Sequence, residues 1–299
     1  MPVNLSAFFL EDTGIPISLI KKMNTNAQTP EIDQKLPILI SVPHGGDEIP
    51  PELIGKVALS KKEIFEDGDA LTRQLYDFKH EVVAFIDTPI ARACVDLNRS
   101  QNDRPPHKLD GVIKIVTVNQ IPVYKLGQFP DETLITRLLR NYYFPYHDVL
   151  DALQTNKNII LALDCHSMLA KSPPINPIPG QERPLICLGN RGDKKGHPLK
   201  EGGSITCPPE FIQLLEKCFR RVFADEGGDV KINEPFSGGY IIQSHAKGII
   251  PWIQVEINRK LYLSSPYFNS EALTVSEQRI FELRNKILTI IKMFINIIE

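Results

Sequence analysis

Two histidines, His44 and His166, each follow a short apolar stretch of the chain. The stretch before His44 covers residues 36–42, and the stretch before His166 covers residues 159–163. Such runs, bounded by polar and turn residues, are typical of strands buried on both faces of a sheet. Ligands of open α/β sheets bind beyond the carboxyl ends of the strands, so we expect the two imidazoles to meet in space. Two histidines, one carboxylate and a position left for water form the ligand set of a hydrolytic zinc site.

The carboxylate of such a site can come from two places in the sequence. Asp47, followed by Glu48, lies three residues after His44, whereas Asp67 and Asp69 lie near the expected start of a helix. Spacing alone does not choose between them. The two aspartates would otherwise serve as helix caps.

Both histidines also have an ordinary structural interpretation. His44 precedes the glycine pair Gly45-Gly46 and could be a turn residue, and His166 could be a core histidine bonded to Asp164. The metal hypothesis gains weight from the pair, because both histidines fall at the end of an expected strand.

Glu256 is a charged residue inside the apolar strand pattern 252–257. Burying a carboxylate is costly unless it is paired or has a function. It could pair with Arg259 or Lys260, or it could be the general base that takes a proton from an activated water. The pattern alone supports both interpretations equally.

Arg92, Asn98 and Arg99 place two guanidinium groups and an amide within eight residues. A guanidinium binds a carboxylate through two parallel hydrogen bonds, so these residues could hold an anionic substrate. They could equally form surface pairs with Asp96 and Asp103.

Strand and helix patterns alternate along the chain, which predicts an α/β fold in one domain over residues 36–299, with a largely parallel sheet covered by helices on both faces. Residues 1–35 are expected to form a peripheral segment. The expected elements are strands at 36–42, 82–86, 159–163 and 251–257, helices at 67–78, 131–153, 209–223 and 275–298, an extended segment at 92–99 and a proline-rich ordered loop at 171–184. Pro145 is expected to kink or break the second helix.

The composition favours a soluble protein with small-molecule partners. Charged residues make up 23% of the chain and the formal net charge is -2, without the basic block that indicates nucleic-acid binding. Neither a membrane-length apolar run nor a secretory signal is evident, so we expect a cytoplasmic protein. The five cysteines lack a CxxC spacing, and we expect them to be reduced and mostly buried.

Seven blocks of residues, in the same order, resemble the N-formylglutamate amidohydrolase family over about residues 38–262. They are Ser41-Val42-Pro43-His44-Gly45-Gly46, Asp67-Gly68-Asp69, Arg92 with Asp96-Leu97-Asn98-Arg99, Gly111-Val112-Ile113 with Pro122-Val123-Tyr124, Asp164-Cys165-His166-Ser167, Ser237-Gly238-Gly239-Tyr240-Ile241 with His245, and Gln254-Val255-Glu256-Ile257-Asn258-Arg259. Each block alone is weak, but their combined order is specific.

The resemblance implies a three-layer fold like that of the zinc carboxypeptidases, with a mixed, mostly parallel sheet between helices. It also implies one zinc ion and hydrolysis of N-formyl-L-glutamate to glutamate and formate, a reaction of histidine degradation. Residue by residue, it implies metal ligation by His44 and His166, water activation by Glu256 and polarisation of the scissile carbonyl by Arg92. The residues expected to bind substrate are Asn98, Arg99, Gly239 and His245.

The third metal ligand departs from the carboxypeptidase pattern. Carboxypeptidase-type sites use a glutamate three residues after the first histidine, where this chain has Asp47. The formylglutamate enzymes keep an acid at the position of Asp67, so the resemblance favours Asp67, with Asp69 and then Asp47 as alternatives.

Two other functions stay open on the sequence alone. One is a related metallohydrolase that acts on another N-acyl amino acid or on a short peptide C-terminus, with the loop 171–184 setting the choice. The other is an inactive binding module on the same fold. The sequence does not indicate the oligomeric state.

Overall fold

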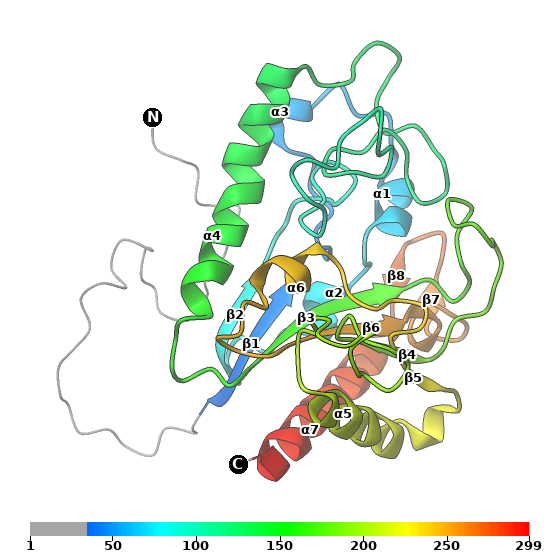
Figure 1. Ribbon diagram of the computed structural model, residues 1–299. Coiled ribbons are helices and arrows are strands. Elements are labelled where there is room, and N and C mark those ends of the chain that lie inside the picture. The colour runs from blue at the N-terminus through cyan, green and yellow to red at the C-terminus, as the bar shows by residue number, and fades with distance from the viewer. Residues whose placement is uncertain (1–34, 299) are drawn as a thin grey trace, which may run out of the picture.

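A six-stranded sheet forms the centre of the computed structural model, which describes residues 35–298 (Figure 1). The strands are β1 (Leu36–Val42), β2 (Val82–Asp87), β3 (Leu161–Met168), β4 (Ile186–Gly189), β5 (Val230–Ile232) and β6 (Trp252–Asn258), with a separate pair β7 (Phe268–Asn269) and β8 (Thr274–Val275). The α-helices are α1 (Lys61–Asp67), α2 (Thr72–Leu75), α3 (Glu132–Leu138), α4 (Phe144–Leu153), α5 (Pro209–Val222), α6 (Tyr240–His245) and α7 (Glu277–Ile298). Short 3-10 turns η3 (Pro51–Leu53), η5 (Ala224–Glu226) and η6 (Arg259–Leu261), and the π-helical turn η4 (Leu139–Tyr143), complete the set. The peripheral segment expected at 1–35 lies outside the described residues, apart from Lys35.

The sheet is mixed and mostly parallel, as predicted. Its strand order is β2-β1-β3-β6-β4-β5. Strands β2, β1, β3 and β6 pair in parallel, β4 pairs antiparallel with β6, and β5 pairs in parallel with β4. The carboxyl ends of β1, β3 and β6 therefore meet at one edge of the sheet, where ligands of α/β proteins bind.

The central strands are buried on both faces, which explains their continuous apolar sequence. Every residue of β3 and of β6 is buried, polar ones included. β3 is longer than the expected run 159–163, and it continues through Asp164 and His166 to Met168. His166 thus lies inside a strand rather than after one.

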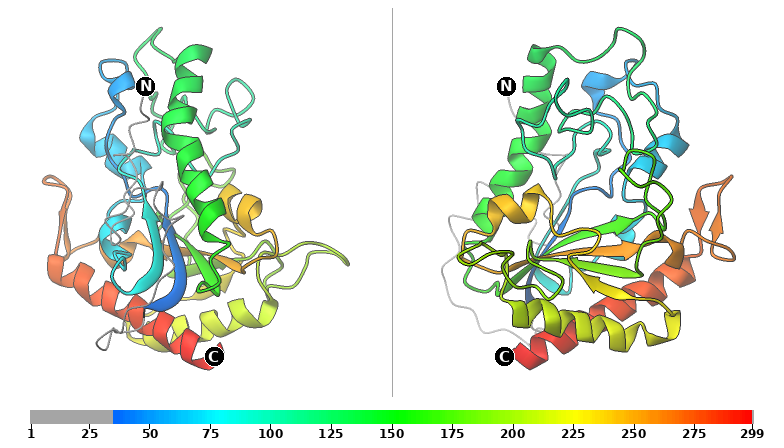
Figure 2. Two further views of the ribbon diagram at one scale, coloured as in Figure 1. Left: turned by 90° about the vertical axis from the view of Figure 1, so that its left-hand side faces the viewer. Right: turned by 45° about the vertical axis from the view of Figure 1, so that its right-hand side comes forward.

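Helices cover both faces of the sheet (Figure 2). Helices α5 and α7 contact each other and pack with α2 into one apolar cluster, whereas α3, α4 and α6 belong to the cluster on the other face. On α7 the buried residues recur at spacings of three and four, as the amphipathic pattern predicted. Their burial fixes the sheet between two helical layers and gives the strand ends a rigid support.

The helix expected at 67–78 is wrong in its boundaries. Helix α1 ends at Asp67 and begins after Ser60, whose side chain accepts a hydrogen bond from the Glu63 amide while Glu63 accepts one from the Ser60 amide. This reciprocal capping box satisfies two free amides at the helix start. A second, short helix follows after Leu71, which has the left-handed φ of 64°. The turn between the two helices contains Asp69.

Two other segments also differ from expectation. Residues 92–99 form turns rather than an extended strand, with the amides of Cys94 and Val95 both bonded to the Ala91 carbonyl. The helical region 131–153 continues through Pro145, but it is not one uniform α-helix, because the π-helical turn η4 separates α3 from α4, which has Pro145 in its first turn. Proline lacks the amide proton and clashes with the carbonyl four residues before it, and the wider π turn removes that conflict.

The cysteines behave as predicted, since all five are buried free thiols. Within residues 35–298, no helix combines the length and the apolar character that crossing a membrane requires.

Candidate metal centre and substrate cavity

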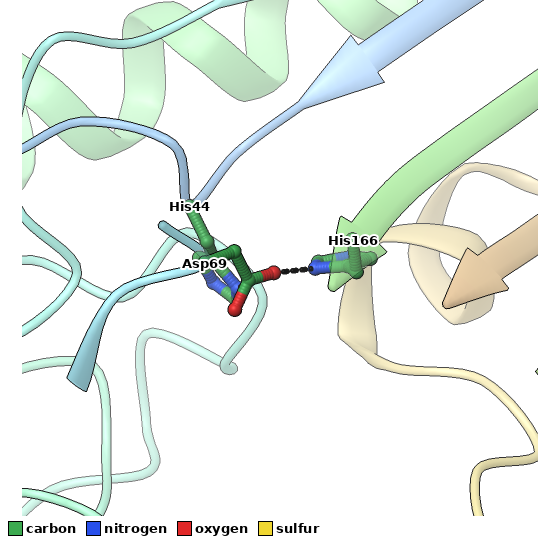
Figure 3. Close-up of side chains that lie close together, drawn as sticks. All are labelled: His44, Asp69 and His166. Atoms are coloured by element: carbon green, nitrogen blue, oxygen red, sulfur yellow. Dashed lines mark hydrogen bonds and ion pairs between the residues drawn. The ribbon is translucent and has the colours of Figure 1, made fainter. Parts of the chain in front are cut away.

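Three side chains from distant parts of the chain converge at the carboxyl ends of β1 and β3. His44 lies two residues after β1, Asp69 lies in the turn between α1 and α2, and His166 lies on β3. One ligand atom from each residue falls within 4.8 Å of the others. The three side chains point toward one another, with the ion pair between Asp69 and His166 at their centre (Figure 3). We call these residues the site cluster.

Close backbone packing brings Asp69 to the first histidine. The Asp69 amide donates to the His44 carbonyl at 2.9 Å. Gly45 allows this approach, because a Cβ atom there would lie 2.5 Å from Arg73 Cγ and 2.9 Å from the Arg73 amide nitrogen. A larger residue at position 45 would collide with the start of α2, which directly follows the Asp69 turn.

The outer nitrogen of each imidazole is bonded to a further buried carboxylate. His44 Nε2 lies 2.8 Å from Asp96 Oδ1, and His166 Nε2 lies 3.0 Å from Asp164 Oδ2. An ionised carboxylate can only accept, so each Nε2 carries a proton, and each Nδ1 faces the Asp69 carboxylate. Carboxylate–histidine pairs of this kind orient the histidines of metal sites and fix their tautomer.

The two inner nitrogens, His44 Nδ1 and His166 Nδ1, both face the Asp69 carboxylate. His44 Nδ1 is buried and has no hydrogen-bond partner among residues 35–298. It lies 3.6 Å from Asp69 Oδ2, and His166 Nδ1 lies 2.9 Å from the same oxygen. Buried polar atoms are nearly always satisfied, so this orphaned nitrogen points to a missing partner. Two imidazoles and a carboxylate suit zinc, and the residues therefore fit a single divalent cation.

The electrostatics of the site cluster favour positive charge. Burial alone would lower the pKa of His166, but Asp164 and Asp69 outweigh burial and raise the pKa well above its usual value. Burial would likewise raise the pKa of Asp69, yet His166 and His44 hold it well below the usual value. The carboxylates that retain a proton on His166 would also stabilise a cation in its place.

Asp67, which the sequence favoured as the carboxylate ligand, does not join the two histidines. Its carboxylate accepts from the Val118 amide at 2.7 Å and from the buried Lys114 ammonium at 3.3 Å. Asp67 closes the last turn of α1 and faces the loop of Lys114, and only after Gly68 does the chain turn toward His44. Asp69 replaces it as the candidate ligand. Asp47, the remaining alternative, is exposed.

A cavity of about 350 Å³ opens beside the site cluster. Its wall contains most of the residues expected to act on substrate, namely Arg92, Asn98, Arg99, Gly239 and Glu256, together with the site cluster itself. Pro173, Ile175 and Asn176 of the loop 171–184 also line it, as expected for that loop.

Glu256 lies next to His166, because the two are register partners on the parallel strands β3 and β6. Gln254 Nε2 donates to Glu256 Oε1 at 2.8 Å. Glu256 forms no ion pair with any residue between 35 and 298, and Arg259 instead contacts Asp69 at 3.2 Å. Burial raises the pKa of Glu256 to about 7, against the opposing positive charge of His166. A carboxylate with such a pKa exchanges protons readily near neutral pH.

Both guanidinium groups pair with aspartates, Arg92 with the expected Asp96 and Arg99 with Asp110 in place of Asp103. Arg92 Nη2 lies 3.0 Å from Asp96 Oδ2, and Arg92 Nη1 lies 3.6 Å from Asp69 Oδ1. Arg99 donates from Nη2 to Asp110 Oδ2 at 2.7 Å and from Nε to the Asp110 carbonyl at 3.0 Å. Arg92 thus lies against the site cluster, and Arg99 lies farther out with its side chain 33% exposed.

Asn98 and Gly239 fit together across the cavity wall. Asn98 Oδ1 accepts from the Ile241 amide at 2.7 Å, and Asn98 Nδ2 lies 3.2 Å from His166 Nε2. A Cβ atom at Gly239 would lie 2.3 Å from Asn98 Nδ2, so only glycine leaves room for the amide. The Gly239 amide donates to Gln254 Oε1 at 2.6 Å, which links this wall to Glu256.

His245, expected to bind substrate, is not part of the cavity wall. It ends α6 and is buried, with Nε2 lying 2.8 Å from His147 Nδ1 and Nδ1 lying 3.0 Å from Asp151 Oδ1. Its ring contacts α4, and its centroid lies 5.9 Å from that of the Trp252 ring on β6.

Several polar residues around the site were given no catalytic or metal-binding role from the sequence, although Asp164 was considered as a hydrogen-bond partner of His166, which the structure confirms. Asp96, Asp164, Gln254 and Arg259 all contact a residue of the site cluster or Glu256. Two of them had a detectable signal, since Asp164 precedes His166 by two residues and Gln254 precedes Glu256 by two. Alternate residues of a strand share one face.

The fold and the site together define an α/β protein of the hydrolase type with a candidate His/Asp/His metal centre. The model of the N-formylglutamate amidohydrolase family matches residues 36–263, and the chain belongs to this family. The expected resemblance is therefore confirmed. No curated protein sequence matches the chain.

Two solved structures support the same fold. The crystal structure of N-formylglutamate amidohydrolase from Ralstonia eutropha JMP134 is similar with a TM-score of 0.65 and 20% identity, over 87% of this chain and 93% of that chain. The gene product Atu2144 from Agrobacterium tumefaciens is similar with a TM-score of 0.56 and 14% identity, over 89% of this chain and 91% of that chain. A metallo-carboxypeptidase from Burkholderia cenocepacia shows a weaker likeness, with a TM-score of 0.37 and 11% identity over 91% of this chain and 60% of that chain.

Proposed function

We propose that this protein hydrolyses the amide bond of a small N-acyl amino acid with the help of one zinc ion, and that N-formyl-L-glutamate is its substrate. The observation that carries the proposal is the convergence of His44, Asp69 and His166 beside Glu256 in one cavity. A metal-dependent hydrolase needs this combination of ligands and a nearby base. The five buried free thiols fit a reducing compartment such as the cytoplasm.

His44, Asp69 and His166 would hold the ion, with Asp96 and Asp164 orienting the imidazoles. Such an ion, when bound, supplies a Lewis acid that polarises the substrate carbonyl and lowers the pKa of water. The chain's own residues would then provide proton transfer and substrate alignment.

Glu256 is the proposed general base. Gln254 holds Oε1 of the carboxylate, and burial raises the pKa of Glu256 to about 7, so Glu256 can accept the proton of the attacking water. The water oxygen bonds to the acyl carbon, the carbon–nitrogen bond breaks, and the proton on Glu256 passes to the leaving nitrogen. The products from formylglutamate are formate and glutamate, and every atom of the water is accounted for.

Arg92 is the proposed donor to the carbonyl oxygen. Its guanidinium lies against Asp69 and Asp96 and lines the cavity, so its charge is held beside the reacting carbonyl. Donors fixed where negative charge develops lower the barrier without reorganisation. Asn98 and Arg99 would align a substrate carboxylate. Arg99 uses Nε and Nη2 to bind Asp110, so its Nη1 would donate to the substrate.

The substitution Glu256→Gln tests the assignment of the base. It keeps the size of the side chain, so we expect unchanged zinc content with a loss in kcat of about 10²- to 10⁴-fold. The measurement is formylglutamate hydrolysis by protein whose zinc content has been determined. Unchanged turnover in the zinc-loaded variant would remove Glu256 from the mechanism.

The alternative functions separate in the same assay. Zinc without formylglutamate hydrolysis, but with turnover of another compound in a panel of N-acyl amino acids and short peptides, would identify a related amide as substrate. Zinc without any turnover would indicate a binding protein on a hydrolase fold.

A further inference from the structure

One arginine in the cavity wall, Arg183, has no part in the proposed mechanism. It lies at the end of the loop 171–184, directly before β4. Its amide donates to the Ala170 carbonyl at 2.9 Å, and its carbonyl accepts from Asn258 Nδ2 at 3.3 Å. The backbone of Arg183 is therefore fixed beside the carboxyl end of β6, near Glu256.

The guanidinium of Arg183 is held in place, but no carboxylate of the described part of the chain pairs with it. Its Cζ lies 4.8 Å from the centroid of the Phe236 ring, which also lines the cavity. Arg183 Nε is buried without a hydrogen-bond partner, and Arg183 forms no ion pair within residues 35–298. A guanidinium that is stacked on an aromatic ring and left with unused donors is preorganised for a planar anion.

The other guanidinium groups of the cavity wall are already engaged with carboxylates. Arg92 pairs with Asp96 at 3.0 Å, Arg99 with Asp110 at 2.7 Å, and Arg259 with Asp69 at 3.2 Å. Among the described residues that line the cavity, Arg183 is thus the arginine whose full fork remains available for a ligand.

We propose that Arg183 is a specificity-determining residue that binds a second carboxylate of the substrate, so that the cavity selects N-acyl derivatives of dicarboxylic amino acids. This inference rests on the proposed function and deepens it, because Arg99 would take one carboxylate and Arg183 the other. Burial lowers the pKa of Arg183 while the charge of Glu256 opposes this, which agrees with a guanidinium facing the reactive end of the cavity.

The test compares N-formyl-L-glutamate with N-formyl-L-glutamine, which has nearly the same shape and one carboxylate fewer. We expect Arg183→Met to lower kcat/KM for the glutamate derivative by about 10- to 100-fold, mainly through KM, because charge-assisted hydrogen bonds are lost. The glutamine derivative should change little, so the preference collapses. Arg183→Lys should restore part of the preference, since it keeps the charge without the fork.

A matched control exists in the same loop. Lys171 pairs with Glu182 at 2.9 Å, its side chain is 63% exposed, and it does not line the cavity. Lys171→Met removes one positive charge without reaching the substrate, so the preference should remain. If Arg183→Met slows both substrates by the same factor, its role is structural and the proposal is overturned.

A binding measurement separates this inference from the proposed function. Calorimetry of the zinc-loaded protein with glutarate and with butyrate requires no hydrolysis. Tighter binding of glutarate that disappears in Arg183→Met supports the carboxylate site even if no formyl amino acid is hydrolysed. Glutarate binding that Arg183→Met leaves unchanged overturns it, whether or not hydrolysis occurs.

Discussion

Among residues 35–298, two groups combine two buried histidines with one aspartate, and they differ in how the imidazole nitrogens are used. The site cluster is His44, Asp69 and His166. The other group, which we call the internal cluster, is His147, Asp151 and His245 on helices α4 and α6. Both groups join residues far apart in the sequence, and the four histidines are buried.

In the internal cluster each imidazole nitrogen has a partner. His147 Nε2 lies 3.0 Å from the Leu97 carbonyl, His147 Nδ1 lies 2.8 Å from His245 Nε2, and His245 Nδ1 lies 3.0 Å from Asp151 Oδ1. In the site cluster His44 Nδ1 has no hydrogen-bond partner among the described residues and belongs to a residue that lines the cavity. The same residue types thus build either a closed structural contact or an open ligand set, and an unused nitrogen facing a cavity distinguishes the two.

Removing one histidine from each cluster should give the largest contrast. We expect His166→Ala to weaken zinc binding by more than about 100-fold, because a direct ligand contributes more than the outer partners, which are worth about 10- to 100-fold. His245→Ala should leave zinc affinity unchanged and lower only stability. Competition with a chelating dye measures both affinities, and equal losses in the two variants would erase the distinction between the clusters.

Substitution of the carboxylates that hydrogen-bond to the histidines should give a smaller difference in zinc affinity between the two clusters. Asp164→Asn replaces the acceptor of His166 Nε2, so we expect zinc affinity to fall by about 10- to 100-fold. Asp151→Asn makes the matched change beside His245 and should leave zinc affinity as it is. A larger zinc loss for Asp151→Asn than for Asp164→Asn would contradict our assignment of the clusters.

Acid should affect stability through the internal cluster. Burial, followed by the charge of His245, lowers the pKa of His147 to about 3, with Asp151 and Asp164 opposing. The folded-state pKa lies below the unfolded value of about 6.5, so the unfolded chain binds more protons and stability falls as the pH drops from about 6.5 toward 3. The slope due to this one group is at most about 1.4 kcal/mol per pH unit.

Urea unfolding of the wild type and of His147→Gln between pH 7 and pH 5 isolates that contribution. The stability difference between the two proteins should shrink as the pH falls, because only the wild type loses the contribution of a buried neutral His147. A difference that stays constant with pH would show that His147 is not held neutral by its surroundings.

The sequence predicted the sheet and the histidine pair for one physical reason. Strands β1, β3 and β6 are buried on both faces, so their apolar runs stand out, and parallel strands place His44 and the end of β3 at one edge. Short elements such as β4 and β5 carry too few residues for a periodic signal. Their pairing with β6 depends on contacts with residues far away in the chain.

A different cause explains why the sequence alone did not distinguish Asp67 from Asp69 as the metal ligand. The two residues are separated by one glycine, and the end of helix α1 directs one toward Lys114 and the other toward the histidines. The Ser60-Glu63 capping box was a usable signal, because it places the helix start before Asp67. His245 was assigned to the cavity with its neighbours Gly239 and Tyr240, and the turn of α6 carries it away.

A crystal structure of the zinc-loaded protein, with anomalous diffraction measured on both sides of the zinc absorption edge, tests the central claim most directly. We expect one zinc ion bound by Nδ1 of His44, Nδ1 of His166 and the Asp69 carboxylate, at about 2.0–2.2 Å from each. Zinc bound at the internal cluster, zinc held by Asp67 in place of Asp69, or no zinc peak at His44 and His166 would contradict the account.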